Sequence, residues 1–149
     1  MTQVLFISTD VEPYFMACAE RLAKDHAVEV HVVRWPVNKE APFQTGDGSG
    51  VKVHERTSFN DISLRRFANQ LLPDIVLASG WVDKVYMQVC RDARKRGTPT
   101  VMISDTAWRG DMRQWAAVGA SRFWLHRTFS HAWVTGEAQA MYAGYLGDR

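Results

Sequence analysis

The stretch PTVMISDTAWRG, residues 99–110, decides the fold of this chain. Residues 99–103 are uncharged and rich in Val, Ile and Thr, which predicts a strand buried on both faces. A strand of this kind belongs to a parallel sheet that carries helices on both sides. Open parallel sheets bind ligands outside the carboxyl ends of their strands, so we expect Asp105, Trp108 and Arg109 at the lip of a binding crevice.

Length and charge limit what the chain can be. Its 149 residues are 46% hydrophobic, which suits one well-buried core and predicts a single domain over residues 1–149. The net charge of +2 arises from 18 basic and 16 acidic residues that are mixed along the sequence. A nucleic-acid binder would concentrate its basic residues in a stripe, so we expect no nucleic-acid partner.

The chemistry-bearing residues predict neither a metal nor a cofactor. Cys18 and Cys90 do not form a CxxC pair, and the five histidines show no metal-ligand spacing. The apolar run near the N-terminus is too short for a signal peptide, and no stretch approaches the about 18 apolar residues of a spanning helix. We therefore predict a cytoplasmic protein and leave peripheral attachment at the inner membrane face open.

Strand and helix patterns alternate along the whole chain. Strands are predicted at residues 4–8, 28–35, 51–56, 74–79, 99–103 and 131–135, and helices at residues 13–25, 61–72, 82–96, 112–127 and 138–146. Right-handed crossovers then give a six-stranded, mainly parallel sheet in the order 3-2-1-4-5-6. The predicted fold class is α/β, a doubly wound, Rossmann-like three-layer sandwich.

Apolar spacing predicts which side of each helix packs on the sheet. In the first helix, Tyr14, Cys18 and Leu22 recur every four residues, and Phe15 widens this stripe. In the fourth helix, which Asp111 can cap, the apolar and small residues at helical spacing are Met112, Trp115, Ala116, Gly119 and Phe123.

Four predicted strand ends converge on one edge of the sheet with small polar residues. They are Ser8-Thr9-Asp10, Ser79-Gly80-Trp81, Ser104-Asp105 and Thr135-Gly136-Glu137. Sugars and phosphates need dense hydrogen-bonding groups, and the free N–H groups of the following helices add donors. The same hydroxyls also serve as ordinary helix caps, and for Ser8, Thr9, Ser79 and Thr135 capping is the favoured interpretation.

The loop after residue 103 carries a less ordinary carboxylate. Six residues separate Asp105 from the next good helix cap at Asp111, so capping and ligand binding stay equally open for it. Arg109 is either a ligand contact or a solvated loop residue, and Trp108 is either a stacking platform or a plug under the loop. The basic run at residues 91–96 is best explained as cations complementing a helix carboxyl end.

Standard phosphate and nucleophile motifs are missing. The sequence contains neither G-x-x-x-x-G-K-[ST] nor G-x-G-x-x-G after its first strand, and it contains no G-x-S-x-G. The usual P-loop, dinucleotide cradle and α/β-hydrolase nucleophile are therefore excluded.

The order of these segments resembles the N-terminal domain of GT-B retaining glycosyltransferases, the group 1 or family 4 type. The resemblance is carried by VLFIS (4–8), DHAVEVHVVRW (25–35), LLPDIVLASGW (71–81), PTVMISDTAWRGDMRQW (99–115) and HAWVTGEAQAMYAGYLG (131–147). It implies a domain that receives a saccharide or lipid-linked acceptor in polysaccharide biosynthesis. A missing C-terminal domain would bind the nucleotide-sugar donor, so the isolated chain is expected to be inactive.

The resemblance also implies roles for individual residues. Asp105 would orient an acceptor hydroxyl or steady charge as the catalytic group, and Ser104 stands where the family often has histidine. Family members commonly carry Gly-Gly in the first turn, where this chain has Asp10-Val11-Glu12-Pro13. The implied acceptor-binding residues are Asp10, Glu12, Trp81, Ser104, Trp108 and Arg109, and those near the interdomain cleft are Ser79, Gly80, Gly136 and Glu137.

Two further hypotheses come from other classes of protein. The first is a self-contained flavodoxin-like or receiver-type ligand-binding module. Ser8-Thr9 is a poor version of the Ser/Thr-rich phosphate loop of a flavin module, and Asp10 with Glu12 supplies part of a receiver's acidic cluster, but no lysine follows Ile103 or Val134. The second is a structural domain that forms a homodimer through exposed apolar residues at the carboxyl edge.

Overall fold

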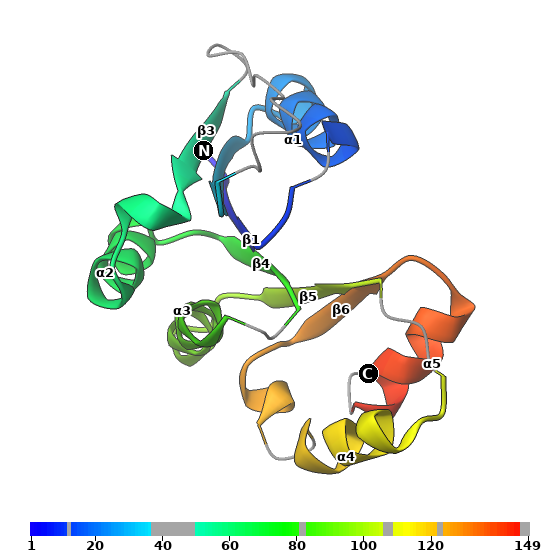
Figure 1. Cartoon of the computed structure of the whole chain (residues 1–149). Coiled ribbons are helices and arrows are strands. Elements are labelled where there is room, and N and C mark those ends of the chain that lie inside the picture. The colour runs from blue at the N-terminus through cyan, green and yellow to red at the C-terminus, as the bar shows by residue number, and fades with distance from the viewer. Residues whose placement is uncertain (12, 37–49, 81–82, 106–108, 122–123, 147–149) are drawn as a thin grey trace.

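Six parallel strands form one sheet at the centre of the molecule (Figure 1). The computed structural model describes residues 1–11, 13–36, 50–80, 83–105, 109–121 and 124–146. The strands lie in the order β3-β2-β1-β4-β5-β6, and every neighbouring pair is parallel. Their bounds are Gln3–Ser8 (β1), Glu29–Arg34 (β2), Val51–Glu55 (β3), Ile75–Ser79 (β4), Thr100–Ser104 (β5) and His131–Val134 (β6). The predicted fold class and strand order are confirmed.

Helices connect these strands in the predicted alternation. They are α1 (Pro13–His26), α2 (Asp61–Leu71), α3 (Lys84–Lys95), α4 (Met112–Ser121) and α5 (Glu137–Tyr145), with 3-10 turns η1 (Arg56–Ser58) and η2 (Leu125–Arg127). The prediction that the fourth helix continues to Arg127 is wrong. The turn η2 instead brings Leu125, together with Phe129 beyond it, into the core.

The helices cover the sheet unequally. Helix α1 lies on one face, and α2 and α3 lie on the other (Figure 1). On the face covered by α1, the sheet presents Val4 and Phe6 of β1 and Val30 and Val32 of β2. These residues share one face because every second side chain of a strand points to the same side. On the same face, no described helix lies over β4 to β6, where Trp133 is 58% exposed.

Of the residues predicted to face the sheet from α1, Phe15 does so, with its ring stacked on that of Phe6 at a centroid distance of 3.9 Å, but the rest of the predicted stripe is wrong. Tyr14 is 72% exposed and Leu22 is 38% exposed, whereas Met16, Ala19 and Ala23 are buried. Small side chains let the helix approach the sheet closely. A Cβ placed on Gly50, which has φ +77°, would lie 3.1 Å from the Cβ of Ala23.

The expected face of α4 is also wrong. Met112 is 89% exposed and Trp115 is 55% exposed, while Gln114, Val118 and Ser121 are buried. The Gln114 Oε1 accepts hydrogen bonds from the backbone N–H groups of Arg109 at 2.7 Å and Gly110 at 3.0 Å. This polar anchor turns Gln114 inward and leaves the larger apolar side chains outside.

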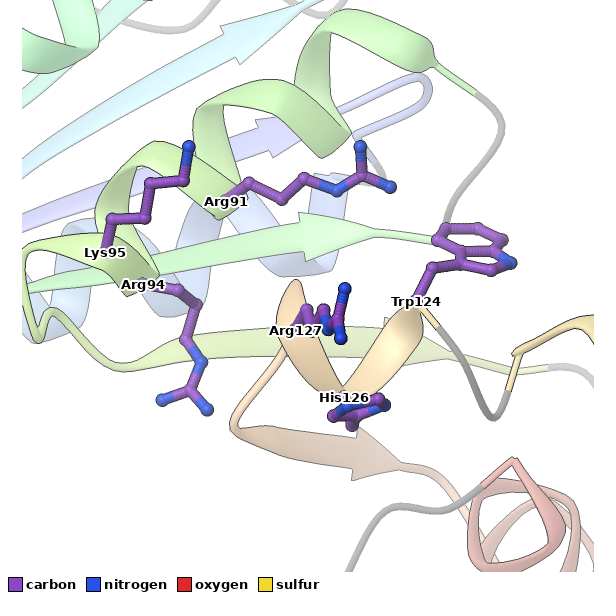
Figure 2. A pocket seen from close by; sticks show the side chains of 6 residues that line it. All are labelled: Arg91, Arg94, Lys95, Trp124, His126 and Arg127. Atoms are coloured by element: carbon purple, nitrogen blue, oxygen red, sulfur yellow. The ribbon is translucent and has the colours of Figure 1, made fainter.

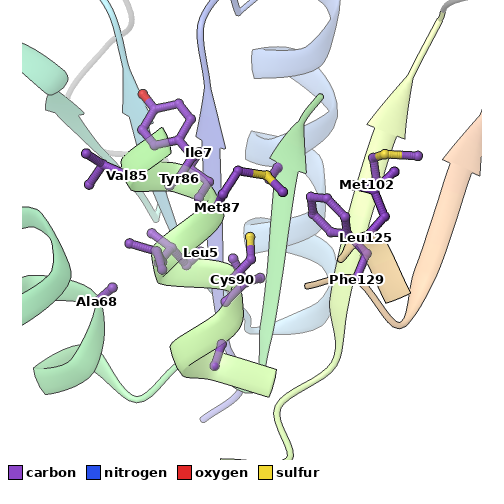
Figure 3. Close-up of a cluster of buried hydrophobic side chains, with 14 of the residues drawn as sticks. Leu5, Ile7, Ala68, Val85, Tyr86, Met87, Cys90, Met102, Leu125 and Phe129 are labelled. Atoms are coloured by element: carbon purple, nitrogen blue, oxygen red, sulfur yellow. The ribbon is translucent and has the colours of Figure 1, made fainter. Parts of the chain in front are cut away.

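The main core lies between the sheet and α3 (Figure 3). Leu5 and Ile7 of β1 meet a helix face that includes Tyr86 and Cys90, and Leu64 of α2 closes the cluster. Burial raises the pKa of the Cys90 thiol to about 12, so this cysteine is an inert core residue. Within the described parts of the chain, no helix has the length and apolar character needed to span a membrane.

Three hydrogen-bonded side chains line β2 and β3 on the α2 side. The carboxylate of Glu29 accepts from His31 Nε2 at 2.9 Å, and His31 Nδ1 lies 3.1 Å from His54 Nε2. A carboxylate only accepts, so Nε2 of His31 carries a proton. Nδ1 of His31 and Nε2 of His54 then share one proton in their hydrogen bond. If both of these nitrogens were protonated, two N–H groups would face and repel each other.

Burial and charge oppose protonation at this cluster. Burial lowers the pKa of His54, and the charges of His31 and Lys52 lower it further. The rings of Phe59 and Phe67 lie beside His54, with centroids 6.3 and 4.8 Å away. His54 is therefore a neutral imidazole at neutral pH.

This cluster predicts that the protein loses stability as the pH falls. The unfolded chain binds the His54 proton more readily than the folded protein, because the folded-state pKa lies below the ordinary value of 6.5. The free energy of unfolding should fall as the pH drops through about 6.5, and this contribution should level off below the folded-state pKa. Urea unfolding at a series of pH values measures the slope. His54→Leu should flatten it, whereas the exposed His26→Gln should not, and a level wild-type profile would contradict the prediction.

Candidate functional site

The order of the strands has a switch point between β1 and β4. From β1 the chain moves toward β2 through α1, and from β4 it moves toward β5 through α3 on the opposite face. The direction in which the chain moves across the sheet thus reverses between β1 and β4. The helices that follow these two strands, α1 and α3, lie on opposite faces of the sheet. In open parallel sheets this switch point is where ligands bind.

Three hydroxyl groups meet at the switch point. Ser8 Oγ donates to the backbone oxygen of Asp10 at 2.5 Å and lies 2.9 Å from Ser79 Oγ, and Ser79 Oγ accepts from the backbone N–H of Thr9 at 3.1 Å. The Thr9 and Ser79 hydroxyl oxygens lie 3.4 Å apart. Ser8 is buried, whereas Thr9 and Ser79 are half-buried. We call Ser8, Thr9 and Ser79 the hydroxyl cluster.

Helix α3 is hydrogen-bonded to the end of β1 that carries Ser8 of the hydroxyl cluster. The Tyr86 hydroxyl donates to the backbone oxygen of Ser8 at 3.1 Å, and burial together with Asp83 raises the pKa of Tyr86 far above its usual value. Asp83 caps α3 by accepting from the backbone N–H of Val85 at 2.8 Å. The end of β1 is thereby tied to the first turn of α3.

The turn after β4 contains a glycine with a positive φ. Gly80 has φ +66°, which favours glycine, and among the described residues a Cβ added there would meet no atom within 4 Å. Its backbone N–H donates to the oxygen of Ile103 at 3.0 Å. The ends of β4 and β5 are therefore joined beside the hydroxyl cluster.

A second group of predicted residues lies at the ends of β5 and β6. Asp105 is exposed, and its backbone oxygen accepts from Gln139 Nε2 of α5 at 3.3 Å. Gly136 precedes α5 in an extended conformation, and Glu137 is exposed in the first turn of that helix. The half-buried Ser104 completes this group.

The remaining predicted residues divide into exposed and undescribed ones. Asp10 and Arg109 are exposed, and Asp111 caps α4 by accepting from the Gln114 N–H at 2.7 Å. Glu12, Trp81 and Trp108 lie outside the residues that the structure describes. In the described part of the chain, no three His, Cys, Asp or Glu residues are grouped so that they could hold a metal ion.

One buried cation lies near the start of α3 and is not among the predicted site residues. Arg56 ends the strand predicted at residues 51–56, and it is 7% exposed. Its Nη1 donates to the Phe59 oxygen at 2.9 Å, and its Nη2 and Nε lie 3.2 and 3.5 Å from carboxylate oxygens of Asp61 and Asp83. The Trp35 ring centroid lies 5.4 Å from the guanidinium carbon. No sequence signal marks this residue, because its partners come from three other elements.

Comparisons with known proteins show the fold. No protein-family description and no curated protein match the sequence. The Bordetella bronchiseptica enzyme WbmH, solved in complex with NAD+, is 16% identical over 71% of this chain and 39% of its own, with a TM-score of 0.51. Phenylacrylic acid decarboxylase from Aquifex aeolicus is 12% identical over 99% of this chain and 93% of its own, with a TM-score of 0.53.

A third similar structure is a short-chain dehydrogenase/reductase from Veillonella parvula. It is 9% identical over 98% of this chain and 64% of its own, with a TM-score of 0.49. This chain therefore spans less than two thirds of the dehydrogenase and of WbmH.

These similarities correct the family resemblance. The structures with TM-scores above 0.5 that the fold matches are an NAD+-bound enzyme and a decarboxylase, and they are not GT-B glycosyltransferases. The predicted membership in that group is wrong, and the acceptor and donor roles that it implied lose their basis. The fold of this chain is Rossmann-like.

Proposed function

We propose that this protein is a self-contained Rossmann-like ligand-binding module whose site is the hydroxyl cluster at the switch point. The observation that carries the proposal is the convergence of Ser8, Thr9 and Ser79 at the carboxyl ends of β1 and β4. Two of these hydroxyls are half-buried, so a ligand can reach them. Hydroxyl groups both donate and accept, which suits phosphate oxygens and sugar hydroxyls alike.

The ligand class that fits best is a mononucleotide. The first turn of α1, which begins at Pro13, contains no acidic residue, and free N–H groups at such a helix start favour phosphate. The exposed Asp10 carboxylate can accept from a sugar hydroxyl. The absence of G-x-G-x-x-G disfavours a dinucleotide pyrophosphate, although WbmH was solved with NAD+.

The second group of residues would contact the rest of the ligand. Ser104 and Asp105 follow β5, Gly136 and Glu137 precede α5, and Arg109 is exposed after the same strand. Their carboxylates accept hydrogen bonds and Arg109 donates them, so this group suits a polar ligand portion.

The homodimer predicted from the sequence stays a prediction.

Binding measurements test the proposal. Calorimetric titration with FMN, AMP and NAD+ should give a mononucleotide affinity that exceeds the affinity for NAD+. Ser79→Ala removes the hydroxyl that lies within hydrogen-bond distance of Ser8 Oγ and accepts from the Thr9 N–H, and it should weaken mononucleotide binding about tenfold, the cost of about 1.4 kcal/mol. The exposed Ser58→Ala on η1 is the matched control and should bind as the wild type does.

Two results would contradict the proposal. One is the absence of mononucleotide binding to the folded wild-type protein at millimolar concentration. The other is unchanged affinity in Ser79→Ala when thermal unfolding shows that the variant is folded.

A further inference from the structure

A basic groove lies away from the switch point, between the last turns of α3 and the turn η2 (Figure 2). It has a volume of about 740 Å³, which falls within the size range of small-molecule sites. Since α3 ends before β5 begins and η2 precedes β6, the groove lies toward the amino ends of these strands. Its lining residues are Arg91, Arg94, Lys95, Trp124, His126 and Arg127.

The groove concentrates positive charge. Arg91, Arg94, Lys95 and Arg127 are permanently charged at neutral pH, and no acidic residue lines the groove. Within the described ranges, none of these four cations has a carboxylate oxygen within 4.0 Å. The nearby Asp92 pairs instead with Arg65 at 2.8 Å. The groove is therefore an uncompensated cationic surface.

A helix-end effect explains only half of this cluster. Arg94 and Lys95 lie in the last turn of α3, where cations complement the helix dipole. His126 and Arg127 come from a different segment, and the fold brings them to the same groove. The dipole of α3 does not account for these two residues, so the tertiary fold places them beside Arg94 and Lys95.

The wall of the groove is anchored to the core. Arg91 Nε donates to Thr128 Oγ1 at 3.1 Å, and Thr128 is fully buried. The Arg91 guanidinium carbon lies 5.8 Å from the Trp124 ring centroid, and the Thr128 hydroxyl donates to the Trp124 oxygen at 3.0 Å. α3 and η2 are thus held together by Arg91, which keeps the cationic side chains in a defined arrangement.

We propose that this groove binds a small molecule that carries at least two phosphate groups. Guanidinium groups match phosphate oxygens with paired N–H donors, and Arg91, Arg94 and Arg127 supply three of them. Trp124 offers a flat apolar wall to the rest of the ligand. The overall charge of +2 and the confinement of the cluster to two short segments favour a small anion over a nucleic acid.

Titration with inorganic tripolyphosphate tests this site directly. Arg94→Gln/Arg127→Gln removes two groove charges and should weaken tripolyphosphate binding at least about tenfold. The control is Lys24→Gln/Arg66→Gln, which removes two exposed charges from α1 and α2 and should change the affinity less than about twofold. Both double variants carry the same net charge.

Further measurements distinguish binding in the groove from binding at the switch point and from nonspecific attraction of anions. Arg94→Gln/Arg127→Gln should leave the FMN and AMP affinities of the switch-point site unchanged, so the groove and the switch-point site can succeed or fail independently. Equal weakening in the two double variants would overturn the proposal, because it would show a nonspecific charge effect. A single-stranded DNA oligonucleotide that binds more tightly than tripolyphosphate, or sulfate that binds equally well, would overturn it as well.

Discussion

Replacing Tyr86 by Ala should lower the free energy of unfolding by about 3–5 kcal/mol, the usual cost of truncating a fully buried aromatic ring. Tyr86 is 2% exposed and is among the largest fully buried side chains. Its ring packs between α3 and β1, and its hydroxyl binds the end of β1 through the Ser8 oxygen at 3.1 Å. Truncation would leave both a cavity and an unpaired carbonyl.

Tyr86→Phe separates these two contributions. It keeps the ring and removes only the hydrogen bond, so we expect a loss of about 1 kcal/mol. Urea unfolding followed by circular dichroism measures both variants. A loss below about 1 kcal/mol in Tyr86→Ala would show that the ring is not packed as the structure describes.

Replacing Arg56 by Met should destabilise the protein by about 3–5 kcal/mol, because it leaves a buried carboxylate without its cation. The Asp83 side chain is 11% exposed, and Arg56 Nε lies 3.5 Å from its Oδ2, an ion pair without hydrogen-bond geometry. Arg56 also binds the Phe59 oxygen and Asp61. Its removal would loosen the junction of β3, α2 and α3.

Arg65→Met is the matched control for this prediction. Arg65 also pairs with an aspartate of α3, Asp92, at 2.8 Å, but its side chain is 43% exposed. The Asp92 side chain is 16% exposed, so only the arginine of this pair is well exposed to water, and we expect a smaller loss of about 1 kcal/mol. Adding Asp83→Asn to Arg56→Met should recover part of the lost stability, because the unpaired charge disappears. Equal losses in Arg56→Met and Arg65→Met would contradict the prediction.

Most of the fold could be predicted from local patterns. The run at residues 99–103 and its counterparts became parallel strands because continuous apolar stretches cannot stay in water. Asn60 and Asp111 cap α2 and α4 as their residue types suggest. The same generality explains the mistaken family resemblance, because any doubly wound domain presents these segments in this order.

Helix orientation was less predictable than helix position. In α1, Met16, Ala19 and Ala23 rather than Tyr14 and Leu22 meet the sheet, and a Cβ on Gly50 would lie only 3.1 Å from the Cβ of Ala23. In α4, the side facing the core is the one that lets Gln114 accept hydrogen bonds from the preceding loop, and it is not the side with the most apolar residues. Apolar spacing alone shows neither the space available nor the polar partners of a helix.

By itself the sequence determined the order of the strands, the alternation of the helices and the placement of polar residues after each strand. These features follow from patterns among residues that are close to one another in the sequence. Only the tertiary structure decided that Ser8 meets Ser79, that Arg56 is buried and that Arg91 shares a groove with Arg127. Each of these pairings joins residues far apart in the chain, and packing of whole elements sets their distance.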